Sequence, residues 1–369
     1  MKKVRSFVKQ NAVMIIAFFA ALITSFIIPP DSVYLDYFDF KTLTCLFCVL
    51  AVVCALRNIN FFYILARKIV SMFRNTRMCI LALVYITFIG SMIIANDMAL
   101  LTFLPLGYFV LDTTGMKKHM AFTFIMQNIA ANLGGMLTPF GNPQNLYLYT
   151  KFEIPNGEFV KIMLLPFLIA IGIITVCCLF VKKESLEIPD DHVIIDKKRV
   201  VLYMILFAIS ILIVFRGVPY YVGLIIIPAV LIFVDRKALA SVDYPLLFTF
   251  VFFFVFSGNM ARIEVIRNLF EFLLSKSTLL VSILCCQIIS NVPSAILLSQ
   301  FTENYPSLLV GVNIGGVGTI IASLASLITF REYVKHNPGS TGYYIKRFML
   351  YNLAFLIVLT FVMSIVMHG

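Results

Sequence analysis

The sequence of 369 residues is poor in charge: charged residues make up 13% of it, whereas hydrophobic residues make up 61%. A soluble domain carries close to twice that share of charged residues, and so few polar groups could not cover so large an apolar surface. The composition therefore excludes a soluble globular protein and indicates an integral membrane protein surrounded by lipid.

The sequence also lacks the alternation of apolar and polar residues that is typical of a membrane β-barrel. Its apolar runs are continuous, and many reach the roughly 20 residues that a helix needs to cross the hydrocarbon core. One run, residues 11–28, follows a basic segment at 1–9 as in a signal peptide, but it ends at Pro29-Pro30 without a small-x-small cleavage site. We therefore predict an all-α polytopic protein whose first span is retained.

Clusters of metal-binding or catalytic side chains are missing. All eight cysteines lie in apolar runs, where a free cysteine packs as a small hydrophobic residue, and Cys45-x-x-Cys48 has no histidine or acid beside it. The four histidines are scattered in polar loops or at the C-terminal end. We expect no cofactor other than a sodium ion and no enzymatic activity, because no acid/base or nucleophile set converges. A channel is disfavoured because no continuous polar pore is evident.

Basic residues are dispersed over many short loops, which argues against a nucleic-acid partner. With the N-terminus in the cytoplasm, the cytoplasmic segments hold 22 of the 29 Lys and Arg residues, as the positive-inside rule requires. The net charge of +11 therefore reports orientation in the cell's inner (cytoplasmic) membrane. It predicts a cytoplasmic N-terminus, a cytoplasmic loop 182–199 and an external C-terminus.

About nine spanning helices and two re-entrant hairpins are expected. The hairpins, at 78–111 and 277–305, are apolar segments that a polar tripeptide interrupts at the middle. Two of the spans, at 120–150 and 308–330, contain breaks. The continuous spans are expected at 11–30, 42–56, 160–181, 199–215, 219–234, 245–258 and 346–367.

These elements recur in one order: a span, an amphipathic segment, a hairpin, a broken helix and a second span. The order divides the chain into an N-terminal span (1–41), a first repeat (42–181), a linker with two spans (182–244) and a second repeat (245–369). The charge-derived topology starts the first repeat outside and the second inside, so that the repeats are inverted. Inverted repeats with interrupted helices are typical of secondary transporters that bind cargo near the midplane of the membrane.

The polar breaks hold the candidate site. Each hairpin tip has an asparagine, Asn96 in the first and Asn291 in the second. An asparagine amide can bind a cation through its oxygen or donate a hydrogen bond to an anion. In the broken helices, we align residues 133–142 with residues 317–326.

The first broken helix cannot continue through Gly141, because Pro139 and Pro143 flank it. The freed backbone groups need partners at membrane depth, and a bound ion or substrate is a natural one. The N-termini of half-helices carry partial positive charge and favour anions, whereas carbonyl ends favour cations.

Asp97 is the only acid or base that this topology places at membrane depth. An ionisable group there is costly and commonly faces a cavity or an ion path. We therefore expect Asp97 to couple transport to an ion. The alternative is a structural aspartate whose carboxylate accepts hydrogen bonds from nearby backbone amides.

At these residues the sequence resembles the ion transporter superfamily, which includes the divalent anion:sodium symporters, the citrate permeases, and the arsenite and sodium/proton exchangers. Residues 96–105, with the sequence NDMALLTFLP, look like the hairpin of the arsenite and citrate-permease branches. Residues 134–145, GGMLTPFGNPQN, are similar to the "GGxxTxIGxPxN" element, and Ser290-Asn291 resembles the second tip of the dicarboxylate branch. The resemblance covers the repeat plan of residues 42–367.

The resemblance implies one sodium site in each repeat: Asn96 with the backbone near Gly141, and Asn291 with Ala325. Asp97 and Val292 stand where the dicarboxylate branch has threonines, which leaves room for proton coupling, or for cationic, neutral or metal-complexed cargo. The substrate is expected between the two tips, near Asn96, Asp97, Asn142, Asn145, Asn291 and Ser326.

We therefore expect secondary active transport of a small anion, a carboxylate or an inorganic oxyanion, coupled to Na⁺ or H⁺. The resemblance further implies that a block of hairpins and broken helices slides as an elevator against a scaffold, commonly in a homodimer. The alternative is an exchanger of the arsenite-efflux or Na⁺/H⁺ antiporter type.

Overall fold

A computed structural model describes residues 11–185 and 196–368; the basic segment 1–9 and the centre of the predicted cytoplasmic loop 182–199 lie outside them. The described residues form helices and no strand, apart from one isolated bridge between Asn75 and Ser185. The predicted all-α polytopic class is confirmed by these helices and their apolar composition.

The elements of the first half begin and end close to the boundaries expected from the sequence. The first hairpin is a pair of helices that meet at Ala95, and the first broken helix is divided by a short turn and by Pro143, which begins its second half. Proline suits the first turn of a helix because its missing N–H would have no partner there. The elements are α2 (Ala12–Ile27), η1 (Ser32–Tyr37), α3 (Phe40–Asn58), α4 (Phe61–Val70), α5 (Thr76–Ile94), α6 (Asn96–Thr113), η2 (Lys117–His119), α7 (Met120–Gly134), η3 (Gly135–Leu137), α8 (Pro143–Lys151) and α9 (Asn156–Leu179).

The second half repeats this order after the linker. Within α14, Ser277 leaves the helical conformation (φ −165°, ψ 102°) and separates the amphipathic segment from the second hairpin. This break lies at the predicted start of the hairpin, residue 277. The elements are α10 (Lys197–Val214), α11 (Tyr220–Val234), α12 (Arg236–Ala240), α13 (Tyr244–Arg262), α14 (Glu264–Ile289), α15 (Asn291–Leu298), α16 (Tyr305–Ile314), α17 (Leu324–His336) and α18 (Thr341–His368).

Six of the described helices are both long and apolar enough to cross a membrane: α3, α5, α9, α13, α14 and α18. The other predicted spans are shorter or more polar. Helices α2 and α11 have 16 and 15 residues, α10 begins with three basic residues at 197–199, and each broken helix is divided into short halves. Of the nine expected spans, only α3, α9, α13 and α18 are among these six helices, since α5 and α14 belong to the predicted hairpins.

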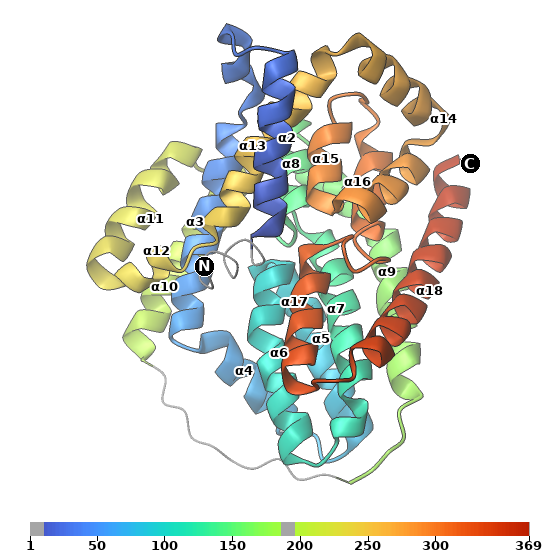
Figure 1. The fold of residues 1–369 in the computed structure, drawn as a ribbon. Coiled ribbons are helices and arrows are strands. Elements are labelled where there is room, and N and C mark those ends of the chain that lie inside the picture. The colour runs from blue at the N-terminus through green and yellow to red at the C-terminus, as the bar shows by residue number, and fades with distance from the viewer. Residues whose placement is uncertain (1–10, 186–195, 369) are drawn as a thin grey trace.

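The two halves meet in the middle of the molecule (Figure 1). The first hairpin, α5 and α6, lies in the lower half of the view, and α15 of the second hairpin lies in the upper half. The chain passes from lower α7 to upper α8 in the first broken helix, and from upper α16 to lower α17 in the second. The two broken helices thus run in opposite directions.

We call α5–α8 with α14–α17 the hairpin block, and α2, α3 and α10–α13 the scaffold. In the scaffold, α13 packs along α2, and α10, α11 and α12 all pack on α3. Helices α9 and α18 contact each other, and both pack against α7 of the hairpin block. The boundary between the block and the scaffold runs beside the hairpin tips.

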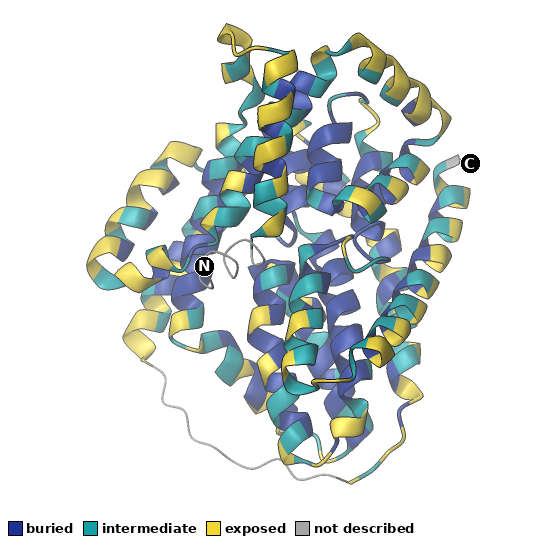
Figure 2. Ribbon diagram, in the orientation of Figure 1, coloured by how far each residue is buried: buried dark blue, intermediate teal, exposed yellow. Residues whose placement is uncertain are grey.

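Buried residues gather where the two halves meet, and exposed residues lie on the outer faces of α2, α11, α14 and α18 (Figure 2). Many of the exposed side chains are apolar: Phe233 is 86% exposed and Ile288 is 74% exposed. A soluble monomer rarely exposes large contiguous apolar patches. These faces are therefore suited to contact with lipid.

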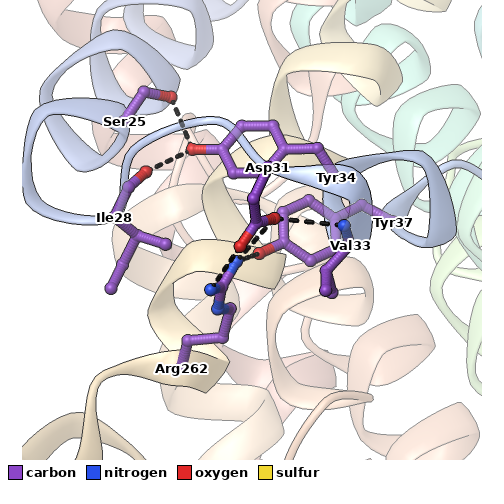
Figure 3. Close-up of polar contacts among 7 residues, drawn as sticks. All are labelled: Ser25, Ile28, Asp31, Val33, Tyr34, Tyr37 and Arg262. Carbon is purple, nitrogen blue, oxygen red and sulfur yellow. Dashed lines mark hydrogen bonds and ion pairs between the residues drawn. The ribbon is translucent and has the colours of Figure 1, made fainter.

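The upper end of the scaffold is tied together by one ion pair (Figure 3). Arg262, at the end of α13, donates to both carboxylate oxygens of Asp31, at 2.7 and 3.1 Å, and to the hydroxyl of Tyr37. Asp31 also accepts from the N–H of Val33 at 3.1 Å and thereby caps η1. The Arg262 guanidinium lowers the pKa of Asp31. These contacts hold the loop between α2 and α3 against α13.

Candidate functional site

The two hairpin tips have the same backbone conformation. Ala95, between α5 and α6, has φ 63° and ψ 150°, and Ser290, between α14 and α15, has φ 76° and ψ 160°. Residues other than glycine rarely adopt this region, and when they do the strain is commonly found at functional sites. The sequence, which has no glycine at either tip, gave no sign of this turn.

Each tip is bonded to the break of the broken helix in its own half. The backbone N–H of Asn96 donates to the carbonyl of Gly141 at 3.0 Å, and that of Asn291 donates to the carbonyl of Ala322 at 2.9 Å. The sodium sites expected from the resemblance paired Asn96 with Gly141 and Asn291 with Ala325. The backbone hydrogen bond of Asn96 is to that same Gly141, whereas the bond of Asn291 is to Ala322, three residues before Ala325.

The shift of three residues follows from a repeated sequence that the alignment of the two breaks missed. Residues 132–135 read Asn-Leu-Gly-Gly, and residues 313–316 read Asn-Ile-Gly-Gly. Both segments end the first half of a broken helix. With these segments in register, Gly141 aligns with Ala322, in agreement with the hydrogen bonds of the tips.

The side chains of Asn96 and Asn291 also behave alike. Each is 3% exposed, and its Oδ1 accepts from the next backbone N–H at 2.9 Å: that of Asp97 in the first tip and that of Val292 in the second. In this conformation the two amide oxygens therefore serve the first turn of α6 and of α15. The Nδ2 of Asn96 points to Asn132 Oδ1 at 3.4 Å.

Two predicted substrate ligands, Asn142 and Asn145, lie inside the crossing of the broken helices. Asn145 Nδ2 donates to three carbonyls of the first break, all at 3.2 Å, and its Oδ1 accepts from Asn313 at 2.6 Å. Asn142 Nδ2 donates to the carbonyl of Asn132 and to Asn313 Oδ1, both at 3.0 Å. These amides connect the two breaks and stabilise their irregular backbone.

Ser326, the third predicted ligand on the broken helices, is fully buried. Its hydroxyl accepts from Asn128 Nδ2 of α7 at 3.4 Å. Like Asn142 and Asn145, it is not among the described residues that line the cavity between the tips. The structure thus brings only three of the predicted substrate ligands to that cavity: Asn96, Asp97 and Asn291.

The cavity lies between the hairpin block and the scaffold. Its volume is about 90 Å³, which leaves room for a few water molecules or a small ion. The hairpin block contributes both tips and the first residues of α8 and α17, including Gln144 and Ser323. The scaffold contributes the beginnings of α2 and α13.

Three charged side chains of the described residues line this cavity: Asp97, Asp243 and Arg331. The sequence singled out only Asp97 among them as a candidate for the site. Asp243 precedes α13 and Arg331 lies in α17. In the sequence both belong to polar segments near loops, and only the packing of α13 and α17 around the tips brings them to Asp97.

Two of the residues that line the cavity have a buried oxygen with no hydrogen-bond donor among the described residues: Asp97 Oδ1 and Gln144 Oε1. Gln144 is only 1% exposed, and its Nε2 donates to Asn313 Oδ1 at 3.3 Å. Buried polar groups are almost always hydrogen-bonded. Because both are acceptors, the partner that they lack is a donor or a cation, and these oxygens therefore fit the sodium ion expected from the sequence.

The described residues contain no group of three or more His, Cys, Asp and Glu side chains that could hold a metal ion. Cys45 and Cys48 are at most 1% exposed and pack in the hydrophobic core. The chemistry of the site is thus that of amides, carboxylates, one guanidinium and helix ends.

Known proteins match most of the chain. Residues 4–310 match a family described as citrate transporter. Over 296 residues, which are 79% of this chain and 81% of the relative, the sequence is 36% identical to the "Uncharacterized transporter MJ0456" of Methanocaldococcus jannaschii. Over 279 residues, 74% of each chain, it is 28% identical to the "Inner membrane protein YbiR" of Escherichia coli.

The family match confirms the resemblance to the ion transporter superfamily, and it includes both hairpin tips and the first broken helix. Neither the family nor the transporter relative is an enzyme. With its apolar helices and its cavity between two units, the chain belongs to the citrate transporter family and is a multi-pass membrane transporter.

Proposed function

We propose that the protein is a secondary active transporter of a small anion, a carboxylate or an inorganic oxyanion, coupled to Na⁺ or H⁺. The observation that carries this proposal is the convergence of four helix N-termini on one cavity. Residues of the first turns of α6, α8, α15 and α17 line it: Asn96, Pro143, Asn291 and Leu324. Helix N-termini carry partial positive charge, which favours an anion.

Arg331 adds a full positive charge to the same wall. A guanidinium binds carboxylate and oxyanion groups through two parallel hydrogen bonds. The site therefore combines dipoles from four helices with one cation, and this combination favours an anion over a neutral substrate.

We propose an elevator motion for the transport step. The cavity is at the boundary between the hairpin block and the scaffold, so that sliding the block would carry the bound anion past fixed helices. The backbone bonds from each tip to its broken helix would keep the block together during the movement. The opposite directions of the two broken helices favour the inverted repeat. We also propose that two copies of the protein form a homodimer through the scaffold.

We place the protein in the inner (cytoplasmic) membrane with its N-terminus in the cytoplasm and its C-terminus outside. The distribution of Lys and Arg supports this orientation. The relative from Escherichia coli is named an inner membrane protein, which favours the same location.

An exchanger of the arsenite-efflux or Na⁺/H⁺ antiporter type is the second candidate. Asp97 and Asp243 favour it, because they give the cavity a cation-attracting side. Symport and exchange differ in direction: a symporter accumulates the anion down an inward cation gradient, whereas an exchanger requires a counter-ion on the opposite side of the membrane.

Uptake into proteoliposomes tests the proposal. Citrate and other carboxylates, sulfate, phosphate and arsenite would each be offered with an inward sodium gradient, with a proton gradient, or with choline alone. We expect the wild type to concentrate one anion class under a gradient. Asp97→Asn should lose this accumulation while keeping counterflow, because removal of the charge uncouples the ion without emptying the anion site.

Asp235→Asn is the matched control, since Asp235 caps α12 through Ala238 at 3.1 Å and does not line the cavity. It should accumulate cargo like the wild type. Equal accumulation by the wild type and Asp97→Asn under every gradient would contradict a coupling role for Asp97. Failure of every anion, with transport of a cation instead, would contradict the anion assignment.

A further inference from the structure

The cavity joins two acidic side chains from units that we propose to move relative to each other. Asp97 is the second residue of α6 in the hairpin block, and Asp243 is the N-cap of α13 in the scaffold. Both line the one cavity, and Gln144, at the start of α8, lines it as well.

The oxygens of these three side chains are only partly used. Asp243 Oδ1 accepts from the N–H of Leu246 at 3.0 Å, which occupies one of its two carboxylate oxygens. Asp97 Oδ1 and Gln144 Oε1 are buried without a donor among the described residues. A wall with two carboxylates and an amide oxygen has the ligand chemistry of a hard cation.

The charges of the wall favour a monovalent cation. The described residues that line the cavity carry two negative charges, on Asp97 and Asp243, and one positive charge, on Arg331. Arg57 of α3 is not a lining residue; its guanidinium contacts the sulfur of Met98 in α6 at 3.5 Å. Among the lining side chains alone, one monovalent ion balances the remaining negative charge, whereas a divalent ion would leave a net positive charge.

We propose that Asp97, Asp243 and Gln144 bind one sodium ion between the hairpin block and the scaffold. This inference rests on the proposed transport function and extends it. It differs from a site formed by a tip asparagine and its own broken helix, because one ligand belongs to the scaffold. The ion is held only while the hairpin block stands beside the start of α13, so that its release accompanies the movement of the block.

Sodium binding can be measured without any substrate. Purified protein in detergent would be unfolded by heat in rising sodium chloride, with choline chloride keeping the ionic strength constant. We expect sodium to raise the Tm of the wild type, because a ligand that binds the folded state stabilises it. Asp97→Asn and Asp243→Asn should each lose this rise, and the double variant should lose no more than either single one.

Asparagine is chosen at 243 because it keeps an N-cap acceptor for α13 and removes only the charge. Asp235→Asn, which alters an equivalent cap outside the cavity, should keep the wild-type rise. An unchanged sodium-induced rise in Asp243→Asn would overturn the proposal, as would a wild type that sodium does not stabilise.

A second measurement needs no variant. Hydrogen exchange of the wild type, with sodium and with choline, should show slower exchange in sodium both at residues 95–98 and in the first turn of α13. Protection of the tip alone would place the ion entirely within the hairpin block and would overturn the shared site. If sodium protects both segments but no anion is transported, the proposed function fails and the cation site stands.

Discussion

The two hairpin tips share one backbone conformation but differ in the chemistry of one side chain. Ala95 and Ser290 adopt the same unusual turn, and the following asparagines make the same two hydrogen bonds. The next residue differs: it is Asp97 in the first tip and Val292 in the second. The backbone of the tip is therefore present twice, whereas the carboxylate next to the tip asparagine is present in the first tip only.

We infer from this difference a division between what holds the site together and what gives it selectivity. On this proposal, a feature found in both tips serves the folding and movement of the hairpin block, and a feature found in one tip serves the ligand. The following changes test that division, beginning with the one expected to have the largest effect.

Replacement of either tip asparagine should abolish transport. Asn96→Leu and Asn291→Leu each remove the acceptor for the next backbone N–H and leave a buried polar group unpaired, at a cost of about 1–3 kcal/mol. Uptake and Tm would be measured together. Asn304→Leu, which removes an exposed cap of α16, is the control and should keep full uptake. Well-folded variants with full uptake and unchanged cation dependence would show that the tip amides are dispensable.

Gly141, in the first break, should tolerate substitution far less well than Ala322, its counterpart in the second break. A Cβ on Gly141 would lie 2.3 Å from the carbonyl oxygen of Gly135 and 2.6 Å from Thr138 Oγ1, and such crowding costs about 1–3 kcal/mol. Gly141→Ala should therefore lower the Tm and weaken uptake. Ala322→Gly, at the equivalent position, removes a side chain where one is already accommodated and should cost about 0.5–1 kcal/mol. Equal effects of the two changes would contradict the alignment of Gly141 with Ala322.

A change far from both tips should have a small effect on stability and none on uptake. Asp31→Asn keeps the cap of η1 but removes the charge that faces Arg262. Because Arg262 lowers the pKa of Asp31, the ion pair contributes above the ordinary aspartate pKa and is lost as the pH falls through the lowered value. The variant should melt slightly below the wild type at neutral pH, and the two should converge in acid. A constant gap at all pH values would exclude the ion pair as its cause.

The substitution expected to have the smallest effect tests only on which side of the membrane the loop 182–199 lies. Asp190→Cys, at a position outside the described residues, should react with an impermeant maleimide only after the cells are permeabilised. The eight native cysteines are buried or half-buried, so that background labelling should be low. Labelling in intact cells would place the loop outside and contradict the topology, together with the inverted relation of the two tips.

The order and bounds of the helices could be predicted because the sequence marks them with strong signals. Continuous apolar runs give the spans, and the polar residues at 96–97 and 290–291 interrupt two of them close to the places where the helices end. Gly141 between two prolines locates the first break in the same way. Such signals depend only on neighbouring residues in the sequence. They can therefore be read without knowing how distant segments of the chain pack.

The cavity was harder to predict because it is made by packing. Asp243 and Arg331 are 88 residues apart in the sequence, and neither lies inside a predicted hairpin. The second break has no proline, so its register could not be fixed in the way that Pro139 and Pro143 fix the first. The repeated Asn-x-Gly-Gly segments contained that information, and they would have placed Ala322 opposite Asn291.

The bonds from each tip to its broken helix join backbone to backbone: the N–H of Asn96 to Gly141, and that of Asn291 to Ala322. No exchange of side chains removes either partner, as long as the chain keeps its path and proline stays away from the donor. Relatives can therefore alter the residues facing the cavity, one at a time, without dismantling the apparatus that carries the cargo. Substrate specificity can change in evolution while the backbone bonds that hold the hairpin block together are kept.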